Sequence, residues 1–193
     1  MSLTSRLRRT AAIAAAALAI SSGAAAGLVA GATPALAATS WTAGVCKVAD
    51  TTKVTVVVDV QNLNNPLTTP VVRCVSGLTS SSTGLAALQA AGVNPVGTAQ
   101  YGLAFICRLL NRPSSTETFT VSGKPYTESC GRTPPAAAYW GYWQATNGGA
   151  WTYSNYGAST AKVKLGGFEG WSFSLNRTAS TNPAPRFTAK RVG

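Results

Sequence analysis

The residue types that carry most enzyme chemistry are scarce in this chain of 193 residues. It contains no histidine, which removes the commonest general base and the usual Ser-His-Asp triad. Its only carboxylates are Asp50, Asp59, Glu117, Glu128 and Glu169. Two strands could bring Asp59 and Glu169 together as a pair for general acid–base catalysis. The alternative is that each carboxylate is solvated or bound to local backbone groups, as most charged residues are, and we favour this alternative. The sequence therefore predicts a protein that is not an enzyme.

Aromatic side chains are the more informative group. All tryptophans except Trp41 lie between residues 139 and 171, among several tyrosines. Because strand side chains alternate between faces, Tyr139 and Trp143 should share one face, and Trp140 and Tyr142 the other. Only one face can pack on a helix, so the other is expected to expose aromatic rings as a binding surface. The alternative is that cross-strand aromatic pairs only stabilise a small sheet.

The cysteines indicate covalent cross-links. An even number of cysteines in an exported chain predicts two disulfides, and four cysteines allow three pairings. We favour the pairing Cys46–Cys74 and Cys107–Cys130, because the second bond would close the polar loop between two predicted strands. A metal site is disfavoured, since the sequence has neither a C-x-x-C pair nor a histidine.

The elements that must position these residues are mainly strands. The β-branched run 53–60 and the run 71–75 predict a hairpin. Residues 84–91 predict a short helix, with cap candidates at 79–83 and a stop at Gly92. The run 101–110 predicts a buried strand, and 114–135 a long surface loop with a short strand at 119–121.

The second half predicts three more strands. The runs 138–145 and 150–154 should pair around the turn signal at 147–149, and residues 168–173 form the last strand. Residues 176–193 are rich in Asn, Pro, Ser and Arg and predict a disordered basic tail. Strands before and after one short helix predict an α+β fold, with the helix packed on one face of a sheet.

The first 37 residues have the three parts of a signal peptide. Arg6, Arg8 and Arg9 precede an apolar stretch at 11–30, and small residues at Ala35 and Ala37 suit a signal peptidase. We therefore predict a leader at 1–37, a domain at 38–175 and the tail at 176–193. The mature protein is expected to be secreted or held at the cell surface.

The charge of the mature chain is strongly positive. After cleavage, thirteen basic and five acidic residues would remain, a net charge of about +8. The excess is scattered, apart from Arg186, Lys190 and Arg191. It predicts solubility and attraction to an anionic cell wall or membrane surface. Nucleic-acid binding is not expected, because the protein is exported and carries no such motif.

These segments resemble the exported transcobalamin-like C-terminal domain family of bacteria. The first half carries VVVD at 56–59, the helix ending at Gly92, FICR at 105–108 and NRP at 111–113. The second half is closer to actinobacterial members, with AYWGYW at 138–143, GAWTYS at 149–154 and GFEGWSF at 167–173. The resemblance covers about residues 46–173.

The resemblance implies a β-grasp-like fold that binds a soluble ligand, with cobalamin or another corrinoid as the candidate and a membrane uptake transporter as the partner. This chain lacks the large helical partner domain of the animal carriers, so a corrinoid would be covered on one side only. We expect Trp140, Trp143, Trp151, Tyr153 and Tyr156 to contact the ligand by flat stacking with a polar edge. Without histidine, the lower ligand of a corrinoid would come from the corrinoid itself or from water.

Three functions remain open at this stage. The first is the extracellular small-molecule-binding module. The second is a cell-wall or glycan-binding surface protein, because aromatic strips also stack on sugars. The third is a secreted protease inhibitor presenting the segment from Ser114 to Cys130, although its flexible Ser and Thr residues argue against a rigid inhibitory loop.

Overall fold

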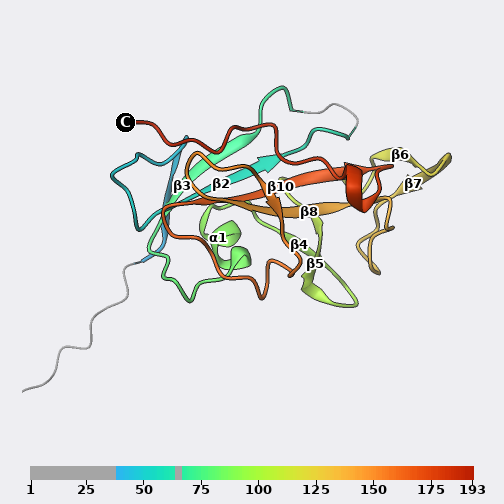
Figure 1. Cartoon of the computed structure of the whole chain (residues 1–193). Helices are drawn as coiled ribbons and strands as arrows, with labels where there is room; N and C mark the ends of the chain where they lie inside the picture. Colours follow the sequence, from blue (N-terminus) through green and yellow to red (C-terminus); the bar gives the residue numbers. More distant parts are fainter. Residues whose placement is uncertain (1–37, 64–66) are drawn as a thin grey trace, which may run out of the picture. The chain divides into compact units, whose positions relative to one another are not determined.

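A mixed six-stranded sheet is the frame of the domain in the computed structural model, which describes residues 38–63 and 67–193 (Figure 1). The strand order is β1-β3-β2-β10-β8-β9. β2 and β10 pair in parallel, and all other neighbours pair antiparallel. The predicted leader lies outside the described residues. The strands are β1 Ser40–Ala43, β2 Val54–Asp59, β3 Val71–Ser76, β8 Ala138–Ala145, β9 Thr152–Tyr153 and β10 Phe168–Leu175.

The predicted first hairpin and the short helix are confirmed. β2 pairs with β3 in the register Val56↔Arg73, and every residue of β2 is buried. Helix α1 spans Gly84–Ala90, where the Thr83 side chain accepts a hydrogen bond from the Ala86 N–H. With seven residues it depends on packing for stability. No helix among the described residues is long and apolar enough to cross a membrane.

The main hydrophobic core lies between α1 and one face of the sheet. Val56 and Val58 of β2, Trp171 and Phe173 of β10, and Leu88 of the helix are all buried in it. Their spacing of two along each strand is the period expected for one face. Trp140 and Tyr142 of β8 join the same core, as the alternation of side chains predicts.

The opposite face of the sheet is covered as well, and the prediction of a disordered tail at 176–193 is wrong. Ala189 is buried in a second hydrophobic cluster with Val57 and Phe168, and Phe187 packs against it. A 3₁₀ turn, η1, spans Ala179–Thr181. The Asn, Pro and Ser content suggests disorder when the segment is considered alone, but an apolar sheet face needs a cover, and these residues supply it.

Polar contacts hold the C-terminal segment, residues 176–193, in place. Arg186 forms a bidentate ion pair with the buried Asp59, at 2.7 Å between Nη2 and Oδ1. The Arg191 guanidinium donates to three backbone carbonyls, those of Lys47, Asp50 and Lys53. These contacts link residues more than 120 positions apart, which explains why no local pattern indicated them.

Two small ribbons stand beside the main sheet. β4 Val96–Thr98 pairs with β5 Gly102–Arg108, and β6 Thr118–Val121 pairs with β7 Lys124–Thr127. The segment at 101–110 is therefore a strand as predicted, but it is not buried, since most of β5 is exposed or half-buried. The loop predicted at 114–135 contains the β6–β7 hairpin.

The favoured cysteine pairing is confirmed. Cys46–Cys74 ties the segment before β2 to β3, and Cys107–Cys130 ties β5 to the chain after β7. The fold is thus a mixed α/β domain with mostly strands, one short helix and two disulfides, which suit folding in an oxidising compartment. Both hydrophobic clusters and both disulfides lie among residues 38–193.

Substitution of Arg186 tests whether the C-terminal segment is part of the fold. Arg186→Ala would leave the Asp59 carboxylate, which is 0 % exposed, without its cation. We expect the free energy of unfolding to fall by about 2 kcal/mol, because hydrogen bonds to charged groups contribute on this order. Urea denaturation measures the loss. Arg132→Ala, at an exposed arginine, is the control, and equal losses in the two variants would contradict the assignment.

Candidate functional site

A cavity of about 870 Å³ lies beside the first half of β8. β8 pairs with β10 along all its residues but with β9 only at Trp143 and Gln144, so its first half has no second neighbour within the sheet. Side chains from both faces of the sheet can therefore reach the cavity at this margin. The walls come from residues 103–106 of β5, residues 133–137, β8, residues 153–158 at and after the end of β9, Trp171 of β10, and residues 177–178.

Three aromatic rings from the helix-facing side of the sheet line the cavity: Trp140, Tyr142 and Trp171. Tyr142 and Trp171 are direct cross-strand partners, and their rings stack with centroids 4.8 Å apart. Trp140 packs edge-on against its own partner, Phe173, and its indole N–H donates to the Arg112 carbonyl at 3.2 Å. The register of β8 and β10 thus fixes the orientation of these rings before any ligand is present.

A buried network of hydrogen bonds holds the Tyr142 hydroxyl. This hydroxyl donates to Glu169, whose carboxylate also accepts from Gln144 Nε2 and from the Lys164 backbone N–H at 2.9 Å. Burial raises the pKa of Glu169, and these three donors oppose that rise. Burial and the nearby carboxyl also raise the pKa of Tyr142, so its hydroxyl keeps its proton at neutral pH.

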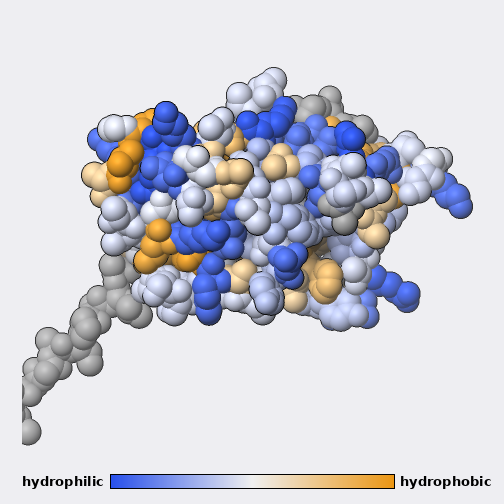
Figure 2. All heavy atoms as spheres, viewed as in Figure 1, coloured by the Kyte–Doolittle hydropathy of each residue, from blue (hydrophilic) through white to orange (hydrophobic). Residues whose placement is uncertain are grey.

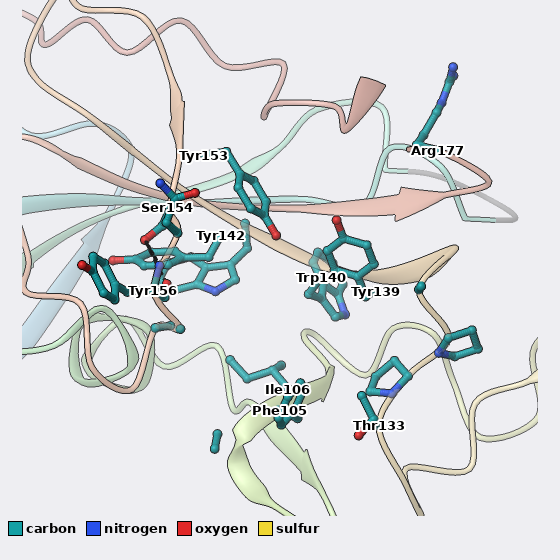
Figure 3. Close-up of a pocket in the computed structure, with 18 of the residues that line it drawn as sticks. Phe105, Ile106, Thr133, Tyr139, Trp140, Tyr142, Tyr153, Ser154, Tyr156 and Arg177 are labelled. Atoms are coloured by element: carbon teal, nitrogen blue, oxygen red, sulfur yellow. Dashed lines mark hydrogen bonds between the residues drawn. The ribbon is translucent and has the colours of Figure 1, made fainter. Parts of the chain in front are cut away.

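Two further tyrosines form the opposite wall. Tyr139 accepts a hydrogen bond from Asn182 Nδ2 at 2.9 Å. In Figure 3 the Tyr153 hydroxyl points toward Tyr139 and Trp140, while Phe105 and Ile106 face them from β5. Burial, followed by hydrogen bonding with Tyr139, raises the pKa of Tyr153 to about 12. The Tyr153 phenol is therefore a neutral hydrogen-bonding group under physiological conditions.

The loop after β9 carries the most exposed aromatic ring at the margin. Tyr156 is 72 % exposed. The start of helix α1 holds the end of this loop, because the Gly84 and Leu85 N–H groups donate to the carbonyls of Ala161 and Ala158. Gly84 is required there, since a Cβ at this position would collide with the Tyr142 ring. One set of contacts thus positions the helix, the loop and a cavity ring.

The residues that line the cavity carry neither a carboxylate, a thiol nor an amine. Their polar atoms are hydroxyls, backbone groups, the indole N–H groups of Trp140 and Trp171, the Asn155 amide and the Arg177 guanidinium. The Arg177 side chain points away from the labelled rings in Figure 3. Within the described part of the chain, no three His, Cys, Asp or Glu side chains are grouped so as to hold a metal ion. The chemistry available in the cavity is stacking and neutral hydrogen bonding.

Of the five residues predicted to contact a ligand, three line the cavity and two do not. Trp140, Tyr153 and Tyr156 lie at its wall or margin. Trp143 and Trp151 belong to the opposite face, where Trp143 is buried and the Trp151 indole N–H donates to the Phe187 carbonyl at 2.7 Å. The prediction that one face exposes its aromatic rings is therefore wrong, because the C-terminal segment covers that face.

Sequence reasoning missed Tyr139, Tyr142, Trp171 and the β5 wall as cavity residues. The first three lie in the aromatic region that was singled out, but whether each faces the core or the cavity depends on where β9 stops pairing. The sequence does carry a signal for the β5 wall, namely the apolar run that contains Cys107. A disulfide can hold such a run as an exposed cavity wall as well as in a core strand.

The carboxylate pair considered from the sequence does not form. Asp59 lies on the face covered by the C-terminal segment and binds Arg186, whereas Glu169 lies on the helix face and binds Tyr142. Each carboxylate satisfies groups on its own side of the sheet.

The fold and the cavity together describe a small disulfide-bonded domain with an aromatic cavity. Residues 132–192 match a family model described as SCO2322-like domain, a description that names no activity. The matched region contains β8, β9, β10 and most of the C-terminal segment, but neither the first hairpin, the helix nor β5. Neither a curated protein nor a solved structure matches the chain.

Replacement of Glu169 tests the buried network by its pH dependence. The unfolded carboxyl ionises near its ordinary pKa of 4.5 and the folded one at higher pH, so the favourable contribution of this group is present below that value and is lost as the pH rises through the folded pKa. We therefore expect the stability of Glu169→Gln relative to the wild type to rise as the pH is raised from about 4 through the neutral range. Urea denaturation across this range measures the difference.

A matched variant separates this effect from general charge removal. Glu117→Gln removes a carboxylate that is ion-paired with Arg112 at 2.9 Å, so this variant should be destabilised at neutral pH. A difference between Glu169→Gln and the wild type that does not change with pH would show that Glu169 does not titrate in this range.

Proposed function

We propose that this chain is an exported small-molecule-binding domain of the transcobalamin-like type, and that the aromatic cavity beside β8 is its ligand site. The observation that carries this proposal is a cavity of about 870 Å³ lined by Trp140, Tyr142 and Tyr153, with the exposed Tyr156 at its margin. This volume lies within the range of known small-molecule sites, which combine many apolar contacts with a few polar groups.

The strand order supports a β-grasp-like fold. Four strands are arranged β3-β2-β10-β8, with two antiparallel hairpin-like pairs joined through a central parallel pair, β2 and β10. The chain crosses from the first pair to the second through helix α1, which packs on one face. This arrangement agrees with the resemblance of the two sequence halves to the transcobalamin-like family.

The properties of the cavity favour a flat ligand that is neutral where it meets the protein. Tyr139, Tyr142 and Tyr153 offer phenol groups, and no ionised side chain points inward among the labelled residues of Figure 3. A corrinoid meets this description through its broad ring and its amide-bearing edge. One domain of this size would cover it on one side, so tight capture requires a partner such as a membrane uptake transporter.

Glycan binding is the second candidate. The exposed Tyr156 ring and the hydroxyl, amide and backbone groups of residues 153–157 are suited to a sugar, which also combines a stacking face with hydrogen-bonding hydroxyls. Under this alternative the protein would act at the cell wall.

Titration of residues 38–193 with cyanocobalamin tests the first candidate. We expect saturable quenching of tryptophan fluorescence, corrected for absorption by the corrinoid. Tyr156→Ala should weaken binding about tenfold, which corresponds to the loss of one stacking ring. This substitution changes an exposed side chain, so it should leave the fold intact.

Trp151→Phe is the matched control, because Trp151 lies under the C-terminal segment on the opposite face. Its affinity should equal that of the wild type. A flat titration would exclude free cobalamin, and binding to purified wall glycan in its place, with the same Tyr156 dependence, would favour the second candidate. Equal loss in both variants would place the binding outside this cavity.

A further inference from the structure

Every carboxylate of the domain has a partner within the domain. Asp50, Asp59 and Glu117 are ion-paired with Lys53, Arg186 and Arg112. Glu128 and Glu169 are buried and accept hydrogen bonds from a tyrosine hydroxyl and a backbone N–H each. These are the only five carboxylates in the sequence, so the outer surface carries excess lysine and arginine with little negative charge among them.

Part of this excess is gathered at one end of the sheet, where three distant segments meet. Val48 donates its backbone N–H to the Val192 carbonyl at 2.8 Å. Gly166 donates to the Lys53 carbonyl at 3.0 Å, and the Arg191 guanidinium bridges the carbonyls of Lys47, Asp50 and Lys53. Residues 47–53, 164–166 and 190–192 therefore form one continuous surface, at the end where β2 and β10 begin.

This surface, called the basic end below, combines cations with exposed aliphatic side chains. Its exposed cations are Lys47, Lys164 and Lys190. Lys53 is half-buried and ion-paired with Asp50, the one acid of this surface, and Arg191 is buried beneath it with its guanidinium on backbone carbonyls. Its aliphatic side chains are Val48, Leu165 and Val192, which are 52 %, 37 % and 50 % exposed. In Figure 2, hydrophobic and strongly hydrophilic atoms lie side by side at the end where Figure 1 marks the C-terminus.

Two of the aliphatic residues follow an exposed lysine in the sequence, Val48 after Lys47 and Leu165 after Lys164. Val192 lies beside Val48, whose backbone N–H donates to its carbonyl. Neighbouring exposed valine and leucine side chains contribute nothing to solubility. On an anionic bilayer, however, they can enter the headgroup boundary while the lysines remain at the phosphates.

We propose that the basic end is a docking surface for an anionic lipid bilayer. The cations supply attraction to the negative surface potential, and Val48, Leu165 and Val192 supply shallow apolar insertion. The aliphatic side chains distinguish a bilayer from a soluble phosphate polymer, which would use the lysines alone. The cavity borders the first half of β8, which pairs with the second half of β10, so docking at the start of β10 leaves the cavity free.

Vesicle co-sedimentation of residues 38–193 tests this proposal. We expect binding to vesicles of phosphatidylglycerol and phosphatidylcholine in equal parts, weaker binding at high salt, and little binding to phosphatidylcholine alone. The double variant Lys47→Gln, Lys190→Gln should bind about 25-fold more weakly, at about fivefold for each lysine. The double variant Val48→Ser, Val192→Ser should bind about tenfold more weakly, through loss of buried apolar area.

Matched controls lie away from the basic end. Lys124→Gln, Arg132→Gln removes the same charge from exposed positions on the β6–β7 hairpin and the segment before β8, and Val96→Ser removes an exposed valine from β4. Both should bind like the wild type, with thermal unfolding used to verify that all variants fold. Equal weakening by the two charge variants would mean that net charge alone attracts the protein, and would overturn the proposal. Binding to soluble polyphosphate with no effect of the valine substitutions would also overturn it, in favour of an anionic polymer.

Discussion

The β2–β10 pair is buried on both faces, and this constraint shapes the rest of the domain. Each strand is buried along nearly its whole length and carries apolar side chains on both faces, so a cover is needed on either side of the sheet. Helix α1 covers one side, but with seven residues it cannot extend over the full sheet. The C-terminal segment covers the other side without forming a long strand or helix, and the Arg186–Asp59 pair holds it there.

The cavity forms where this covering stops. β9 shields β8 at only two residues, and the gap beside the first half of β8 is closed incompletely by β5 and by the loop after β9. The large rings on this margin keep their orientation because they also pack against core residues. Tyr142 stacks on Trp171 and donates a hydrogen bond to Glu169, and Trp140 packs edge-on against Phe173. The site is thus built from core residues at the edge of the sheet, which makes it preformed.

The same architecture sorts the charges. The carboxylates are consumed in holding segments together: Glu117 binds Arg112, and Asp59 binds the C-terminal segment. Lysines are left outside, and several of them come together at one end, where residues 47–53 bind the Arg191 guanidinium and accept a hydrogen bond from Gly166. A sequence that looks evenly basic therefore folds into a surface with a distinct basic end.

Patterns of short range determined much of this protein from the sequence alone. The β-branched run at 54–59, the helix between Thr83 and Gly92, the strand at 138–145 and the alternation of Trp140 with Trp143 follow from local propensity and from the period of a strand. Contacts of long range needed the tertiary structure. Only the folded chain decided that residues 176–193 cover a sheet face, that Trp143 and Trp151 lie beneath them, and that β5 is a cavity wall. The physical reason is that burial depends on which segment covers a face, and this segment can be distant in the sequence: Arg186 lies 127 residues from Asp59, the residue of β2 that it binds.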